Sequence, residues 1–461
     1  MAEFRIEHDL LGDRQVPKDA YYGVQTVRAM ENFQISHVAI SHYRHLIRAL
    51  GFIKKACALA NLECKIMDKK VADAIALASD EVVAGEFDDQ FPVDAVQGGA
   101  GTSTNMNANE VIANRALEHM GKKKGDYKYV HPNNHVNMSQ STNDVYPTSL
   151  RLATAWMLDE LIEEVDHLQK ALHEKSREFA DVLKMGRTQL QDAVPMTLGQ
   201  EFGAYAQMIE EEIAKLRVVQ GQLYTVNMGA TAIGTGITAP KGYAEVVTRH
   251  LAEITELPLV LASNLVKATQ DAGDFVEVST TVKRLAIKTS KICNDLRLLS
   301  SGPRTGIGEI SLPPKQPGSS IMPGKVNPVI PEVVNQVAFE VIGNDMIISM
   351  AAEAGQLELN VMEPMLAFKL FNSILHFKRV LRILTDQCVV GIVANRERAR
   401  SLMENSIGLV TALVPHLGYE LCTDIAKKAQ AEGGSVYEIV LEGGYLTKDQ
   451  LDEILSPEHM L

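Results

Sequence analysis

The stretch from Val329 to Ala352 restricts the possible folds most, because it is apolar on nearly every face of a helix. Its polar exceptions are Asn335, Gln336, Asn344 and Asp345. A helix that is apolar all round needs cover on all sides, and one chain of 461 residues can hardly bury several such helices alone. We therefore expect copies of the chain to associate into an oligomeric helix bundle.

A second long helix is predicted upstream by an apolar seam that alternates spacings of four and three residues. The seam runs through Val278, Val282, Leu285, Thr289, Ile292, Leu296 and Leu299, and Gly302-Pro303 ends it. Apolar faces with helical spacing also mark residues 158–172 and 202–219. The fold class is therefore mainly α, with a central bundle of long helices.

The rest of the chain is less regular and suggests three domains. Residues 1–140 are predicted to form a mixed, mostly helical N-terminal domain, with a helical pattern over 41–78 and a helix near 109–120. Residues 141–395 form the central bundle, and residues 396–461 a small helical domain with glycine turns.

Composition narrows the function. A formal charge of −13 argues against nucleic acid as the main partner. No apolar run is long enough to span a bilayer, and the start lacks the order of a signal peptide. The five cysteines are scattered and contain no Cys-x-x-Cys pair. We expect a cytoplasmic protein without a membrane partner and without a cysteine metal site.

Four polar patches interrupt the helices, and they are rich in hydroxyls and amides rather than histidines or paired acids. They are Thr102–Asn109, Ser141–Asp144, Thr188–Gln189 in a loop over residues 186–195, and Ser319–Asn327. Such side chains suit a small dicarboxylate. They do not suit a metal site, a glycosidase or a nucleotide site, so no metal or cofactor is expected. The sequence is silent on an activating divalent cation.

The fourth patch belongs to the stretch Gly318-Ser-Ser-Ile-Met-Pro-Gly-Lys-Val-Asn-Pro328, directly before the apolar segment. It predicts a mobile loop at a helix N-terminus, with Asn327 as the cap. A carboxylate about 4 Å from Lys325 gains roughly 4 kcal/mol at an effective dielectric of about 20.

This loop resembles the signature of the fumarase/aspartase superfamily, Gly-Ser-Ser-x-Met-Pro-x-Lys-x-Asn-Pro, without a departure. The resemblance implies a three-domain fold whose long helices form a multi-helix core in a homotetramer. It also implies that Ser319 is the base, that Ser320 contributes to the substrate site, and that Lys325 and Asn327 bind a substrate carboxylate. The other patches match the superfamily as well. By that match Thr102, Ser141, Thr142 and Asn143 bind substrate from one subunit, Thr188 and Gln189 come from a second, and the Ser319 loop comes from a third.

Position 189 favours one branch of the superfamily. Fumarases have histidine there, paired with a glutamate that matches Glu332, whereas Gln189 cannot titrate. Loss of hydroxide from malate needs a proton donor, but an ammonium group leaves as neutral ammonia. Residues 351–364 also resemble aspartases, since fumarases typically end that run with Phe-Lys-Pro and this chain has Met-Glu-Pro.

The resemblance therefore implies elimination of ammonia from L-aspartate to give fumarate. The first alternative is a fumarate hydratase on the same scaffold. The second is a non-catalytic structural protein, since the wider superfamily includes lens crystallins.

Overall fold

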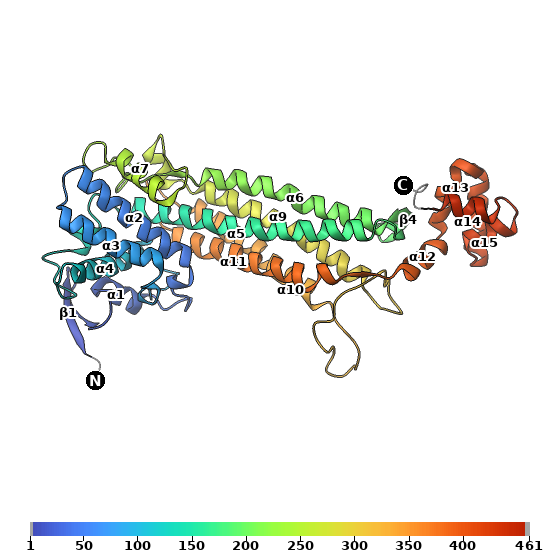
Figure 1. The fold of residues 1–461 in the computed structure, drawn as a ribbon, viewed down its shortest axis with the longest axis horizontal. Helices are drawn as coiled ribbons and strands as arrows, with labels where there is room; N and C mark the ends of the chain where they lie inside the picture. The colour runs from blue at the N-terminus through green and yellow to red at the C-terminus, as the bar shows by residue number, and fades with distance from the viewer. Residues whose placement is uncertain (1–2, 457–461) are drawn as a thin grey trace. The chain divides into compact units, whose positions relative to one another are not determined.

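The computed structural model describes residues 3–456, and the described chain is mainly helical (Figure 1). The long helices are α5 (Thr142–Glu178), α6 (Leu198–Gln222), α9 (Gly273–Leu299), α10 (Val329–Glu353) and α11 (Glu363–Gln387). The shorter helices before and between them are α1 (Val24–Asn32), α2 (Arg44–Glu63), α3 (Lys69–Ala84), α4 (Thr102–His119), α7 (Tyr243–Thr255) and α8 (Leu265–Gln270). The C-terminal helices are α12 (Arg396–Glu404), α13 (Val410–Leu417), α14 (Tyr419–Glu432), α15 (Val436–Glu442) and α16 (Lys448–Ile454).

The strands of the described residues pair only two at a time. Antiparallel pairs are formed by β1 (Phe4–Asp9) with β2 (Gly12–Pro17), by β3 (Leu183–Thr188) with β4 (Gln191–Thr197), and by β7 (Ile310–Ser311) with β8 (Val393–Ala394). A short parallel pair joins β5 (Thr225–Val226) to β6 (Val260–Leu261). One turn of π-helix, η3, covers Pro132–Val136, and short 3₁₀ turns are η1 (Ile40–His42), η2 (Asp88–Gln90), η4 (Val389–Gly391) and η5 (Ile407–Leu409).

The chain divides into two compact units. The first comprises Met1–Leu161, Lys215–Lys283 and Glu340–Leu375, and the second comprises Ile162–Ala214, Arg284–Phe339 and His376–Leu461. The five long helices contribute residues to both units. The three-domain division with boundaries at residues 140 and 395 stays a prediction.

In the first unit, α2 packs against α3 and α7, and α4 packs against α3 (Figure 1). Apolar residues of α2 such as Ile47, Leu50 and Ile53 are completely buried there. Polar side chains of α4, including Asn105 and Asn109, are buried as well. The core of this unit is therefore partly polar, and each buried amide needs a hydrogen-bond partner.

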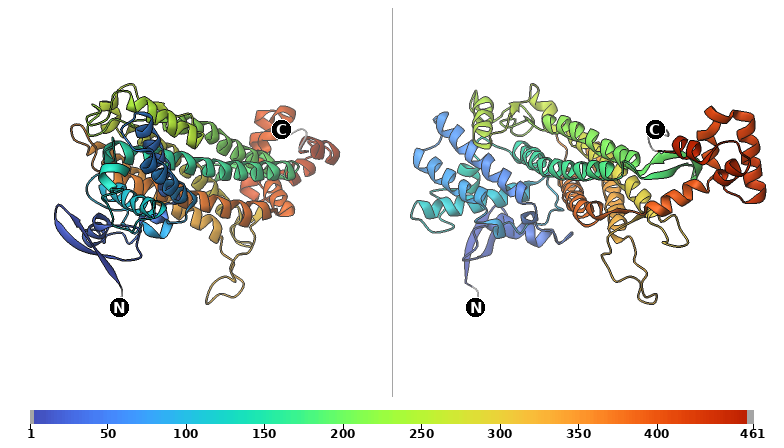
Figure 2. Two further views of the ribbon diagram at one scale, coloured as in Figure 1. Left: turned by 60° about the vertical axis from the view of Figure 1, so that its left-hand side comes forward. Right: turned by 45° about the vertical axis from the view of Figure 1, so that its right-hand side comes forward.

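In the second unit, the β3–β4 hairpin contacts α12 and η5. The right-hand view of Figure 2 shows the green hairpin next to the orange and red C-terminal helices. Met185 of β3 is buried in one apolar cluster with residues of the C-terminal helices, among them Leu413 and Val440. This packing fixes the base of the hairpin, whose tip carries two of the predicted site residues.

The predicted apolar seam is confirmed. All seven of its residues lie in α9 and are at most 5% exposed, and α9 ends at Leu299, before Gly302-Pro303. The segment that begins at Val329 is also helical, as α10. In the single chain, however, α10 leaves Phe339, Met346 and Met350 between 63% and 66% exposed.

The helical pattern over residues 41–78 is confirmed, although it comprises two helices, α2 and α3, which are separated where Lys65 adopts a positive φ of 60° and the Asp68 side chain caps α3. Other local predictions were less accurate. The helix expected near residues 109–120 already begins at Thr102 as α4, since its polar first turns are buried. The expected loop over residues 186–195 is mostly the β3–β4 hairpin.

The described part of the chain contains no helix that is both long and apolar enough to cross a membrane.

Candidate active site

Thr102 is the first residue of α4, in the first unit, and glycines shape the turn before it. Gly101 has a φ of +88°, and a Cβ there would lie 2.4 Å from the Tyr146 ring. Only glycine suits this position, because a side chain meets both a strained backbone and a filled space. The Thr102 hydroxyl is exposed and donates to the Gly99 carbonyl at 2.7 Å.

The second predicted patch is a turn at the start of α5, also in the first unit. The Ser141 hydroxyl accepts from the Asn143 backbone N–H at 3.2 Å, so Ser141 caps the helix and keeps its own hydroxyl proton available to a ligand. The Asn143 amide group donates to the Ala232 carbonyl at 2.7 Å. Its side-chain oxygen is left as an acceptor, which suits an ammonium group.

Asp144 holds this turn in place by hydrogen bonds, and its side chain is completely buried. One carboxyl oxygen accepts from the Ser141 N–H at 3.0 Å, and the other accepts from the N–H groups of Gly229 and Thr231 at 3.1 and 3.0 Å. Burial raises the pKa of Asp144 to about 7, although these hydrogen bonds and Lys54 lower it. The carboxyl group therefore fixes the turn by hydrogen bonds.

The first two patches are linked directly. The Asn105 amide nitrogen, on the first turn of α4, donates to the Thr142 hydroxyl at 3.1 Å. The structure thus brings the α4 N-terminus and the 141–143 turn together within the first unit, so Thr102, Ser141, Thr142 and Asn143 come from adjoining segments.

Thr188 and Gln189 lie in the second unit, at the exposed tip of the β3–β4 hairpin. Thr188 pairs with Gln191, so the connection is the two residues Gln189 and Leu190, with φ values of 55° and 63°. Two consecutive positive φ values are typical of a type I′ turn, where Asn-Gly is the usual choice. A non-glycine residue in this region costs about 1–2 kcal/mol, and such strain concentrates at functional positions.

Arg187 holds the hairpin next to its tip. Its guanidinium lies 2.9 Å from the completely buried Glu309 carboxylate, which also lies 3.1 Å from the Lys184 ammonium. Glu309 directly precedes β7, so this ion-pair cluster fastens the hairpin to the segment that leads toward the Ser319 loop.

Ser319, Ser320, Lys325 and Asn327 lie in the loop of the second unit that precedes α10, and residues 320–326 are exposed. A bridge between Gly318 and Pro323 narrows the loop, and the Ser319 hydroxyl accepts from the Ile321 N–H at 3.3 Å. Gly318 has a φ of +104°, and a Cβ there would lie 2.1 Å from the Lys325 carbonyl oxygen. Glycine is therefore needed at position 318, because the turn brings its backbone against the backbone of Lys325.

Two details of this loop bear on binding. Helix α10 begins at Val329, so Pro328 precedes it and the expected cap at Asn327 is wrong by one residue. This leaves the Asn327 amide group outside the helix. Within residues 3–456, the Lys325 ammonium makes no ion pair, so its charge is available to an anion.

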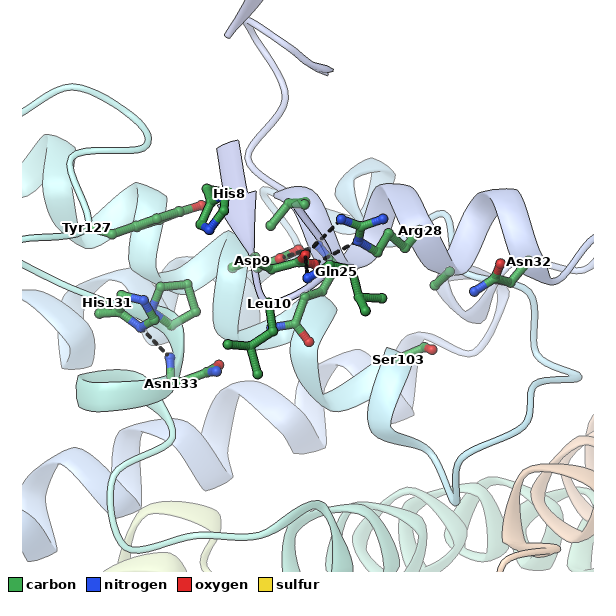
Figure 3. A pocket seen from close by; sticks show the side chains of 15 residues that line it. His8, Asp9, Leu10, Gln25, Arg28, Asn32, Ser103, Tyr127, His131 and Asn133 are labelled. Atoms are coloured by element: carbon green, nitrogen blue, oxygen red, sulfur yellow. Dashed lines mark hydrogen bonds and ion pairs between the residues drawn. The ribbon is translucent and has the colours of Figure 1, made fainter. Parts of the chain in front are cut away.

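A cavity of about 680 Å³ also opens in the first unit (Figure 3). Its lining includes Asp9, Arg28, Ser103, His131 and Asn133. Ser103 belongs to the first polar patch, but the residues predicted individually to bind substrate, such as Thr102 and Lys325, are not in the lining. Arg28 is neutralised by two 2.7 Å hydrogen bonds to Asp9, and burial lowers the pKa of His131. This cavity is therefore poorly charged for a dianion, in contrast to the Lys325 loop.

Within residues 3–456, no group of three or more His, Cys, Asp or Glu side chains is placed to hold a metal ion.

The helical fold and these hydroxyl- and amide-rich segments define the class of the protein. A family model described as Lyase matches residues 12–343, and one described as Fumarase C C-terminus matches residues 409–461. The chain belongs to this lyase family, the fumarase/aspartase superfamily.

Individual relatives are similar over the full length. A protein of Pseudomonas canavaninivorans named aspartate ammonia-lyase is 57% identical, with 100% of this chain and 97% of the relative covered. An Escherichia coli protein of the same name is 53% identical, with 99% and 96% covered.

Solved structures share the fold. A Brucella melitensis protein described as fumarate lyase:delta crystallin bound to cobalt is 52% identical, with a TM-score of 0.97 and 99% of each chain covered. A class II fumarase from Schistosoma mansoni is 35% identical, with a TM-score of 0.93 and 99% of each chain covered. Both structures therefore share the fold of this chain, and its identity to the proteins named aspartate ammonia-lyase is higher than its identity to the class II fumarase.

Proposed function

We propose that this chain is an L-aspartate ammonia-lyase, which eliminates ammonia from L-aspartate to give fumarate. The observation that carries the proposal is the full-length identity of 53–57% to proteins named aspartate ammonia-lyase, against 35% to a class II fumarase. Gln189 supports it, because a side chain that cannot titrate cannot assist the departure of hydroxide.

Ser319 acts as the base. As an alkoxide it removes a proton from C3, and the electron pair moves into the adjacent carboxylate to give an aci-carboxylate dianion. Backbone N–H groups of residues 320–324, with Thr102 and Ser141, stabilise this dianion, and one such donor is commonly worth ~2.7–4 kcal/mol. A serine base is weak unless its alkoxide is stabilised, so the glycine-hinged loop closes before catalysis.

The remaining residues bind and orient the substrate. Lys325 and Asn327 hold the second carboxylate, which agrees with a cation that is not already paired. The side-chain oxygens of Asn143 and Thr188, with Gln189, accept from the ammonium group. Collapse of the dianion then expels neutral ammonia, so the reaction needs no cofactor.

The proposed active enzyme is a homotetramer in which three subunits complete each site. The exposed apolar stripe of α10 supports association, because Phe339, Ile342, Met346 and Met350 recur every three or four residues on one helix face. Exposed apolar patches of this kind mark interfaces. We place the enzyme in the cytoplasm, which agrees with five cysteines that form no disulfide.

One assay tests the reaction. Purified protein is given L-aspartate and, separately, L-malate, and the ultraviolet absorbance of fumarate is followed. The proposal predicts fumarate from L-aspartate only. Formation from L-malate alone would establish the hydratase alternative, and formation from neither would favour a non-catalytic protein.

A further inference from the structure

Lys54, on α2 in the first unit, is a completely buried lysine, and within residues 3–456 no carboxylate lies at hydrogen-bonding distance from its ammonium. Its ammonium donates to the side-chain oxygens of Asn105, Gln140 and Asn137, at 2.7, 2.8 and 3.2 Å. Three N–H donors thus meet three amide acceptors, which satisfies the ammonium form completely. Burying a cation among neutral groups is costly, so this arrangement calls for an explanation beyond packing.

The charge of Lys54 fixes the orientation of one amide. The Asn105 oxygen faces the ammonium, and therefore its NH₂ group faces away and donates to Asn137 and to Thr142, both at 3.1 Å. If the Asn105 amide were flipped, its NH₂ group would face the Lys54 ammonium, and two hydrogen-bond donors would then face each other without an acceptor. Asn105 is consequently held with its N–H groups directed at the Thr142 hydroxyl.

This orientation decides what the Thr142 hydroxyl can do. The hydroxyl oxygen accepts from Asn105, and among the described residues its proton has no acceptor. A hydroxyl has one proton to donate, so Thr142 is set to donate it to a ligand. Each hydrogen bond in such a chain polarises the next in a medium of low dielectric.

We propose that Lys54 is a positioning residue that acts through Asn105 to make Thr142 a hydrogen-bond donor to a carboxylate of the substrate. This inference rests on the proposed function, because it assigns the role of Thr142 toward L-aspartate. Lys54 itself does not contact the substrate.

Electrostatics agrees with this role at neutral pH. Burial lowers the pKa of Lys54 to about 8, and the charge of Asp144 on α5 and the Cys57 thiol on α2 oppose that shift. The ammonium form therefore persists at pH 7, and it places a positive charge behind the turn that binds the dianion.

The first test replaces Lys54 by methionine, which keeps the length of the side chain. The KM for L-aspartate is expected to rise about tenfold or more, because one charge-assisted donor to the carboxylate is lost. The kcat is expected to change less than about threefold, since such binding acts on ground state and transition state alike.

Lys55→Met is the matched control: Lys55 is the next residue on α2, and its ammonium pairs with Asp80 at 2.7 and 2.8 Å at the surface. Its KM is expected to stay within about twofold of the wild type.

A second variant covers the case in which Lys54→Met does not fold. Asn105→Asp gives Lys54 a carboxylate partner and keeps the volume of the side chain, but it removes the NH₂ donor. The Thr142 hydroxyl then donates to the new carboxylate instead of the substrate. The expected result is the same rise in KM with a melting temperature near that of the wild type.

A double-mutant cycle separates positioning from a general structural effect. Thr142→Val should raise the KM in the wild type but have little further effect in Lys54→Met, because Lys54 acts through that hydroxyl. Thr142→Ser keeps the hydroxyl and should restore a near-normal KM. Additive effects in the cycle, or a wild-type KM in Lys54→Met or Asn105→Asp, overturn the inference. Absence of fumarate from L-aspartate with the wild-type chain overturns the proposed function instead, so the two failures are distinct.

Discussion

Replacing Glu363 by glutamine should make the stability of the protein less dependent on pH. Glu363 is the first residue of α11, in the first unit, and only 5% of its surface is exposed. Within the described chain, one of its carboxyl oxygens is buried without a hydrogen-bond partner. Burial raises the pKa of Glu363 to about 8, although the charge of Arg151 opposes the shift.

The sign and size of this pH dependence of the free energy of unfolding follow from proton linkage. An unfolded chain releases the Glu363 proton near pH 4.5, whereas the folded chain holds it until about pH 8. The folded state binds more protons between these values, so the free energy of unfolding falls as pH rises through that window. The whole fall is about 5 kcal/mol, and the part between pH 6 and pH 9 is about 3 kcal/mol. Glutamine has nearly the shape of the neutral carboxyl group and carries no proton to lose.

The measurement is guanidinium chloride unfolding of the wild type and Glu363→Gln, at pH 6 and pH 9. Both proteins are kept at one concentration, because an oligomer's apparent stability depends on concentration. Relative to the wild type, Glu363→Gln should gain about 3 kcal/mol on going from pH 6 to pH 9. Other buried acids cancel in this comparison. The matched control is Glu358→Gln, which removes the same charge at an exposed position of the loop before α11. This variant should alter the free energy of unfolding by less than about 0.5 kcal/mol. A difference between wild type and Glu363→Gln that does not change with pH would refute the reasoning.

Three further predictions concern the site and the assembly. Gly101→Ala should destabilise the fold by about 2 kcal/mol or more, because its methyl group meets the Tyr146 ring at 2.4 Å in a backbone with positive φ; a wild-type melting temperature would contradict this. Ser319→Ala should abolish turnover without lowering the melting temperature, and Lys325→Ala should chiefly raise the KM for L-aspartate; fumarate formation at wild-type rates by either variant counts against these roles. Met346→Glu places a charge on the exposed stripe of α10 and should dissociate the oligomer in size-exclusion chromatography with light scattering, whereas a particle of unchanged mass would exclude α10 from the interface.

The long helices and the family could be predicted from the sequence because their signals are local. The α9 seam repeats at helical spacing, and all of its residues are buried as expected. The Ser319 loop carries its residues within one short segment, so its pattern is complete without the fold. The site residues themselves stay predictions, since their roles depend on bound substrate and on the assembled subunits.

The prediction of local structure from sequence failed where buried polar side chains replace the usual apolar pattern. The first turns of α4 carry Thr104, Asn105 and Asn107, which composition suggested were a loop, yet these side chains are buried in the first unit. The β3–β4 hairpin has Gln189-Leu190 at its turn instead of a glycine signal. In both cases tertiary contacts outweigh the local preference.

Lys54 was missed for a related reason. The adjacent Lys54 and Lys55 look alike, and charged side chains are expected at the surface. The burial of Lys54 could have been predicted from its spacing. Lys54 follows Leu50 by four residues and precedes Cys57 by three, which places it on the buried face of α2.

The sequence by itself therefore determined the family, the helical bundle and the loop that carries Ser319, because each depends on periodicity or on neighbouring residues. Only the tertiary structure decided which lysine is buried, which way the Asn105 amide faces and which carboxyl groups hold their protons. Those properties arise from groups far apart in the chain that share one low-dielectric interior, where each polar atom's role is set by its partners.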